Sequence, residues 1–208
     1  MQRALAIALV SACGAAPPPV DEGGPRGPRA TDHIAEAHRH EEAERQRTSW
    51  PDTRSAGPTD PPVGVWVRSF DSVEHERMAS IHKSRAAAMD AEFAEACAGL
   101  SGEDITVSPL KRLGLGGWNT AAGAIVYLKP HTASPDKLLA QIRCHRAWMM
   151  LGPSDMEDCP LDLPGLAIDA RGDETGVTVS LVVRDPKLVA ELQRRTAKDL
   201  EAAASMRR

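Results

Sequence analysis

The spacing of apolar residues along the chain predicts a helix-rich first half and a mixed second half. The longest helical pattern covers residues 71–98 and presents one heptad-like line of residues, which marks its buried face. That line consists of His75, Met78 or Ala79, His82, Ala86, Met89, Phe93 and Cys97. Gly99 and Leu100 follow it, as expected where a helix ends in a left-handed cap.

The second half predicts strands alternating with helices. Strands are expected at 124–129, 166–170 and 177–183, the last two forming a hairpin across the turn RGDETG. Helices are expected at 135–151, with proline at the first position, and from Asp185-Pro186 to about 204. The glycine-rich run LGLGGWN, which includes Gly114, Gly116 and Gly117, is interpreted as a loop.

From residue 120 onward the predicted order is β-α-β-β-α. Its simplest packing is a two-layer α+β sandwich, ferredoxin-like by analogy and lacking the last strand. Such a fold does not by itself define a function.

The first 62 residues are different, because nine of the sixteen prolines fall there and large apolar residues are scarce. We expect a disordered tether over 13–62, interrupted near 32–47 by a polar helix in which Ile34 is the one large apolar residue. The α+β domain is expected over 63–208, starting with a strand or docking strap at 63–67 (VGVWV).

The N-terminus has the pattern of an export signal. Arg3 precedes nine residues, ALAIALVSA, a run too short to span a bilayer. The stretch Val10-Ser11-Ala12-Cys13 resembles the lipobox of bacterial lipoproteins. The resemblance implies a signal peptide over 1–12 and a mature chain attached to the lipid bilayer through acylated Cys13, and Gly14 in place of Asp favours the outer membrane, facing the periplasm.

Three further cysteines remain after Cys13, and an oxidising compartment permits disulfides. We predict a bridge between Cys144 and Cys159, with Cys97 as the free thiol. Bridges from Cys97 to Cys144 or Cys159 are the alternatives, since spacing alone does not determine pairing.

The strongest candidate for metal chemistry is Cys144-His145, followed by Met149, Met150, Met156 and Cys159, and the second is the group of histidines before residue 83. His75 and His82 share a helix face but lie about 10 Å apart along the axis, so one ion would need a ligand from another element. His145 is adjacent to Cys144, yet the two side chains point apart on a helix, and we expect His145 to be buried and hydrogen-bonded. His38 and Glu42, like Glu36 and His40, are four apart and would bind a cation only weakly.

These observations favour a non-enzymatic, lipid-anchored periplasmic module that binds a protein partner or a small ligand. The alternative is a protein handling copper or zinc, using His75, His82 and His145. No motif pairs a nucleophile with a base, so no enzyme is predicted. The formal net charge of -4 argues against nucleic acid as a partner.

Overall fold

The computed structural model describes residues 27–48, 70–100, 102–129, 134–152, 158–173 and 175–208. The signal peptide, Cys13, most of the tether and the segment 63–67 lie outside these ranges, so the predictions about them stay predictions. Among the described residues, none of the helices is both long enough and apolar enough for a membrane span.

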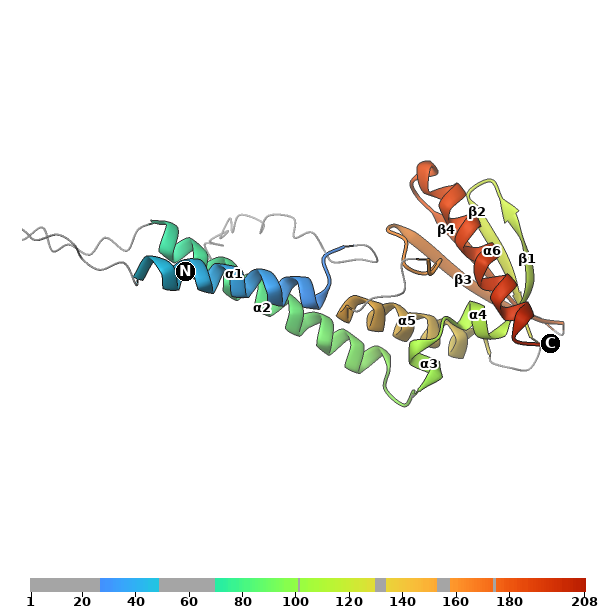
Figure 1. Ribbon diagram of the computed structural model, residues 1–208. Coiled ribbons are helices and arrows are strands. Elements are labelled where there is room, and N and C mark those ends of the chain that lie inside the picture. The colour runs from blue at the N-terminus through green and yellow to red at the C-terminus, as the bar shows by residue number, and fades with distance from the viewer. Residues whose placement is uncertain (1–26, 49–69, 101, 130–133, 153–157, 174) are drawn as a thin grey trace, which may run out of the picture.

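Two antiparallel helices form an elongated arm (Figure 1). Helix α1 covers Ala30–Thr48 and helix α2 covers Phe70–Ala96, so both predicted helices are present. The polar helix α1 packs along α2 over most of its length.

The described residues that follow the arm form an α+β unit at its end, which confirms the predicted α+β class. Its elements are α3 (Glu103–Thr106), α4 (Pro109–Leu113), β1 (Gly114–Thr120), β2 (Gly123–Leu128), α5 (Pro135–Leu151), β3 (Leu166–Asp173), β4 (Gly176–Val183), the 3-10 turn η1 (Pro186–Leu188) and α6 (Val189–Ser205). Helix α5 begins and ends as its sequence predicts: Ser134 accepts a hydrogen bond from the Lys137 N–H, and Gly152 adopts a left-handed conformation with φ 82°.

The sheet is fully antiparallel, in the order β1-β2-β4-β3. Helices α5 and α6 cover one face, against which β4 turns its buried valines and Leu181. The ferredoxin-like order is not confirmed, because β1 occupies the edge beside β2 where that fold has its final strand.

Strand β1 corrects the interpretation of LGLGGWN as a loop. Glycine is depleted in strands, which is why the run suggested a loop. Here the glycine permits close pairing: a Cβ on Gly117 would collide with the Ile125 carbonyl on the neighbouring strand. The missing side chain therefore lets β1 approach β2.

A disulfide joins the arm to the α+β unit. Cys97, just after α2, pairs with Cys144 in α5, with a Cα–Cα distance of 4.7 Å. The predicted Cys144–Cys159 bridge is therefore wrong, as is the assignment of the free thiol to Cys97, because α2 packs against α5 and brings Cys97 to Cys144. Among the described cysteines, the buried free thiol is that of Cys159.

The N-terminal end of α1 is held on the α+β unit by Arg29. Its guanidinium donates to the Met149 carbonyl and forms an ion pair with the buried carboxylate of Asp162 at 3.0 Å. Beyond this end, the packing of α1 on the other described helices and strands is against α2.

Candidate functional site

The interface between α1 and α2 is a seam of alternating alanine and histidine. On α1 its members fall three and four residues apart, and the same spacing recurs on α2, which is the pattern of a coiled-coil seam. The seam consists of Ala30, His33, Ala37 and His40 from α1 and of His75, Ala79, His82 and Ala86 from α2. The small alanines let the two helix backbones approach, and the imidazoles occupy the positions where leucines usually pack.

Each seam histidine meets a histidine of the other helix. The Nδ1 atoms of His33 and His82 are 2.9 Å apart, and those of His40 and His75 are also 2.9 Å apart. In each pair one Nδ1–H donates to the other Nδ1. Because the helices are antiparallel and each carries its histidines seven residues apart, the two pairs form in register.

The four imidazole rings of the two pairs form one continuous row. The ring centroids are 5.1 Å apart in the His33–His82 pair and 5.2 Å apart in the His40–His75 pair. Between the pairs, the rings of His40 and His82 are stacked with centroids 5.8 Å apart. Glu36 approaches Nε2 of His40 at 3.7 Å, which helps to orient that ring.

Burial favours the neutral form of two histidines in this row, His33 and His82. His33 is 2% exposed, and burial, followed by the neighbouring charge on His82, lowers its pKa below the usual 6.5. Burial is also the main cause that lowers the pKa of His82, partly opposed by Glu36. Neutral imidazoles keep the lone pairs that metal ions require. The Nε2 atom of His33 is buried and finds no hydrogen-bond partner among the described residues.

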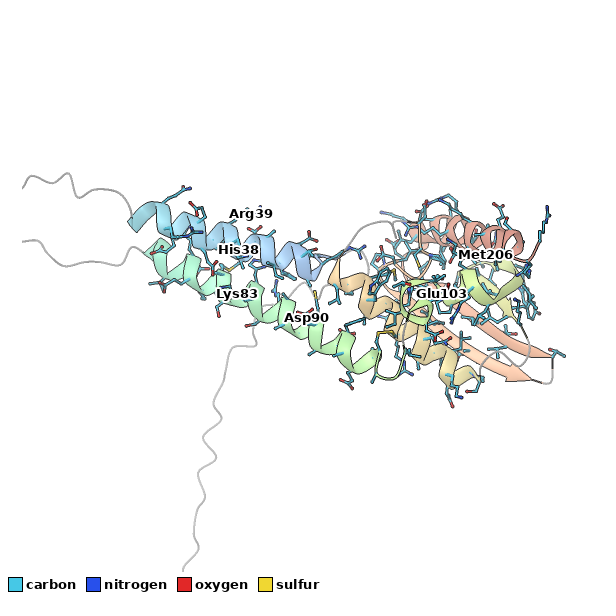
Figure 2. All side chains as sticks on the ribbon, turned by 60° about the horizontal axis from the view of Figure 1, so that its bottom comes forward. His38, Arg39, Lys83, Asp90, Glu103 and Met206 are labelled. Atoms are coloured by element: carbon cyan, nitrogen blue, oxygen red, sulfur yellow. A yellow bond between two sulfur atoms is a disulfide. The ribbon has the colours of Figure 1, made fainter. Side chains whose placement is uncertain are left out.

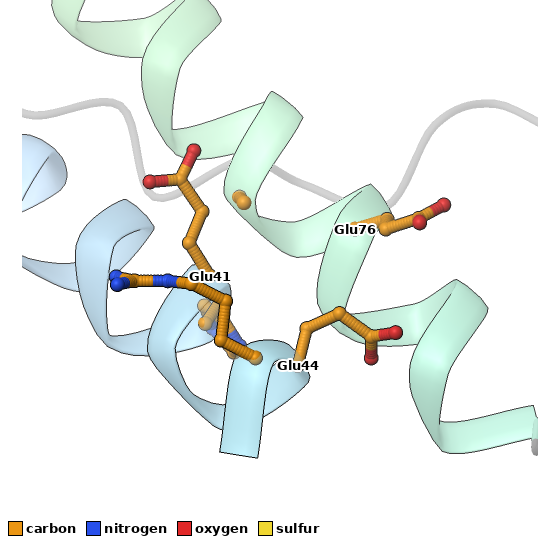
Figure 3. Close-up of a pocket in the computed structure, with 6 residues that line it drawn as sticks. Glu41, Glu44 and Glu76 are labelled. Atoms are coloured by element: carbon orange, nitrogen blue, oxygen red, sulfur yellow. The ribbon is translucent and has the colours of Figure 1, made fainter. Parts of the chain in front are cut away.

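A pocket of about 340 Å³ opens beside the His40 end of the seam (Figure 3). It is lined by His40, Glu41, Glu44 and Arg45 from α1 and by Glu76 and Ala79 from α2. Three of these six side chains are carboxylates, which favours a cation over an anion. Further charged residues, including Arg39, Lys83 and Asp90, lie along the arm (Figure 2).

The predicted set of His75, His82 and His145 does not converge. Cys144, the neighbour of His145, is bonded to Cys97, which lies 15 residues beyond His82 and so about 22 Å along the axis of α2. The imidazoles that meet His75 and His82 belong to α1 instead: His40 contacts His75, and His33 contacts His82. Across the described ranges, no three side chains of His, Cys, Asp or Glu converge as the ligands of one ion.

His145 is buried and hydrogen-bonded, as predicted. Its Nδ1–H donates to the Ile105 carbonyl at 2.7 Å, and its Nε2 lies 3.6 Å from the Cys159 thiol. Burial raises the pKa of the Cys159 thiol to about 12, so the thiol stays protonated at neutral pH. A protonated buried thiol is a poor nucleophile, and this pair gives no support to cysteine catalysis.

Near Cys159, Asp199 accepts a hydrogen bond from Ser108 at 2.9 Å. Burial raises the pKa of Asp199 from 3.8 to about 6. A raised folded-state pKa contributes stability that is complete below about pH 4 and is lost as the pH rises through about 6.

We therefore expect Asp199→Asn to stabilise the protein at pH 7.5 by about 1–3 kcal/mol and to have little effect at pH 4. Urea unfolding of both proteins at the two pH values measures this difference. Ser108 still has an amide oxygen to which it can donate, so the comparison isolates the charge. An equal effect at both pH values would show that the carboxylate does not titrate in this range.

No protein family matches this chain, and no curated protein or solved structure matches it significantly. The assignment of a function therefore depends on the geometry of the seam.

Proposed function

We propose that the chain is an exported, lipid-anchored protein that binds a transition-metal ion such as zinc or copper(II) in the histidine seam between α1 and α2. The observation that supports this most is the pairing of four histidines across two helices, with Nδ1–Nδ1 distances of 2.9 Å in both pairs. With metal–nitrogen bonds of about 2.0–2.1 Å, two imidazole nitrogens on one ion lie about 2.9 Å apart when cis at square-planar copper(II) and about 3.3 Å apart at tetrahedral zinc.

The chemistry of the seam favours these ions. Imidazole binds zinc, copper and nickel well, whereas magnesium and calcium prefer ligands made entirely of oxygen. Histidines at seam positions stabilise a hairpin less than leucines would, since a polar residue there lowers stability. A metal ion between the imidazoles would supply the attraction that the seam otherwise lacks.

Isothermal titration of the purified protein with Zn(II) tests the proposal. We expect His82→Asn and His75→Asn each to weaken binding at its own pair at least about tenfold, because each removes one of that pair's two nitrogens. His38→Asn is the matched control, since His38 lies on the same arm with its side chain 67% exposed. Unchanged affinity in both seam variants would exclude the seam as the site.

The anchor is proposed from Val10-Ser11-Ala12-Cys13. We expect Cys13→Ala to abolish acylation, so that the precursor accumulates and no lipid is attached. Metabolic labelling with palmitate and a mobility shift sensitive to an inhibitor of lipoprotein signal peptidase measure this. Palmitate incorporation that persists in Cys13→Ala would contradict the assignment.

A further inference from the structure

The two imidazole pairs are not arranged to share one ion, because among the described residues no three ligands converge. His33 and His40 are seven residues apart on α1, as are His75 and His82 on α2, which separates their Cα positions by about 10 Å along the arm, whereas the stacked rings of His40 and His82 are 5.8 Å apart between centroids. An ion bonded to both nitrogens of one pair lies about 2 Å from each. A ligand from the other pair would have to lie at the same distance, and no such third ligand is found in the described ranges.

The surroundings of the two pairs differ. His33 is 2% exposed, and the next seam residues on either side of the His33–His82 pair include the buried Ala30 and Ala86. His40 has a side chain 19% exposed and lines the pocket of about 340 Å³, together with the carboxylates of Glu41, Glu44 and Glu76. The His33 ring is thus enclosed, with the half-buried His82 as its partner, whereas His40 opens onto a space that water and small solutes can enter.

Each pair supplies two nitrogens and no more. Among the described residues no third His, Cys, Asp or Glu completes either pair. Structural zinc sites are closed by four protein ligands, whereas an ion with open positions exchanges ligands. At the His40–His75 pair the open positions would face the pocket, where an incoming donor can bind the ion before the imidazoles release it.

We infer that the hairpin holds two metal ions at unequal sites: a retentive site at His33–His82 and an exchangeable site at His40–His75 that opens onto the carboxylate-lined pocket. This inference rests on the proposed function and adds to it the number of ions and their exchange behaviour. The incoming donor is a nitrogen, sulfur or carboxylate ligand of a small chelator or of a polypeptide. Each metal–nitrogen bond that breaks is replaced by a bond to that donor, and no redox step is involved.

A release experiment tests the inference. The full chain is loaded with Zn(II), freed of excess metal and mixed rapidly with the chromophoric chelator 4-(2-pyridylazo)resorcinol, whose absorbance reports released zinc. We expect two equivalents of zinc, released in a fast phase and a slow phase of equal amplitude. His75→Asn should lose the fast phase, His33→Asn should lose the slow phase, and the control His38→Asn should keep both.

The other outcomes distinguish failure of this inference from failure of the proposed function. One bound equivalent, as from a single central site using His40, His82 and Glu36, overturns the inference but leaves the proposed function standing. A single release rate also overturns the inference and leaves the proposed function standing. Loss of both phases in either seam variant leads to the same conclusion. Binding of no zinc by the wild-type chain overturns the proposed function as well. Circular dichroism of each variant, and the Cys97–Cys144 bond detected by mass spectrometry, show that the arm is still folded.

Discussion

Replacing Cys144 by alanine should lower the free energy of unfolding by about 4 kcal/mol, because the bond to Cys97 closes a loop of 47 residues. The loss is large against a total stability of about 5–15 kcal/mol for a typical domain. The bond also fixes the end of α2 on α5. Without the bond, the arm should therefore unfold at a lower urea concentration than the sheet. Urea unfolding under non-reducing conditions measures the change.

The matched control is Cys159→Ala. Cys159 is buried and has a free thiol, so this variant leaves a small cavity and should cost about 1 kcal/mol. Alkylation of the denatured, non-reduced protein should label Cys159 and leave Cys97 and Cys144 unlabelled. Labelling of Cys97 in place of Cys159 would contradict the structure and restore the pairing predicted from the sequence.

Addition of zinc should slow amide exchange in α1 more than anywhere else in the protein. At a free zinc concentration 100-fold above the dissociation constant, one bound ion stabilises the docked helix by about 2.7 kcal/mol, which is about 100-fold slower exchange by local opening. The effect is concentrated in α1 because this helix buries alanines and His33 but no large apolar side chain. Its one large apolar residue, Ile34, is 44% exposed.

Hydrogen exchange with mass spectrometry, with and without Zn(II), gives the comparison peptide by peptide. Helix α6 serves as the internal reference, since it packs on the sheet through Leu192 and lies apart from the seam. Equal slowing in α1 and α6 would indicate a general effect of zinc. No slowing in α1, under conditions where zinc is bound, would place the ion elsewhere.

The sequence predicts the elements of this fold better than their packing. The helix at 135–151 is confirmed to the residue, since its capping serine, N-terminal proline and terminal glycine are local signals. Strand β1 was missed because Gly117 serves a close contact with Ile125 that becomes visible once β2 is in place. The disulfide was misassigned because Cys159 is nearer to Cys144 in the chain, whereas α2 packing on α5 brings Cys97 to it.

The candidate site was partly visible in the sequence. The heptad spacing of His75 and His82 correctly placed both on the buried face of α2, and the distance between them called for ligands from another element. Those partners, His33 and His40, were assigned to a polar helix in a tether because α1 has no apolar stripe. Alanine and histidine, rather than leucine, form its inner face, so hydrophobic periodicity carried no signal that α1 docks on α2.

The central claim is that imidazoles of the seam bind the metal, and pulsed electron paramagnetic resonance of the copper(II)-loaded protein tests it most directly. Electron spin-echo envelope modulation detects the remote nitrogen of a coordinated imidazole. The account predicts modulation from two imidazoles per copper ion, lost when His33, His40, His75 and His82 are all replaced by asparagine and retained in His38→Asn. Copper that binds without imidazole modulation, or modulation that survives the fourfold replacement, would contradict it.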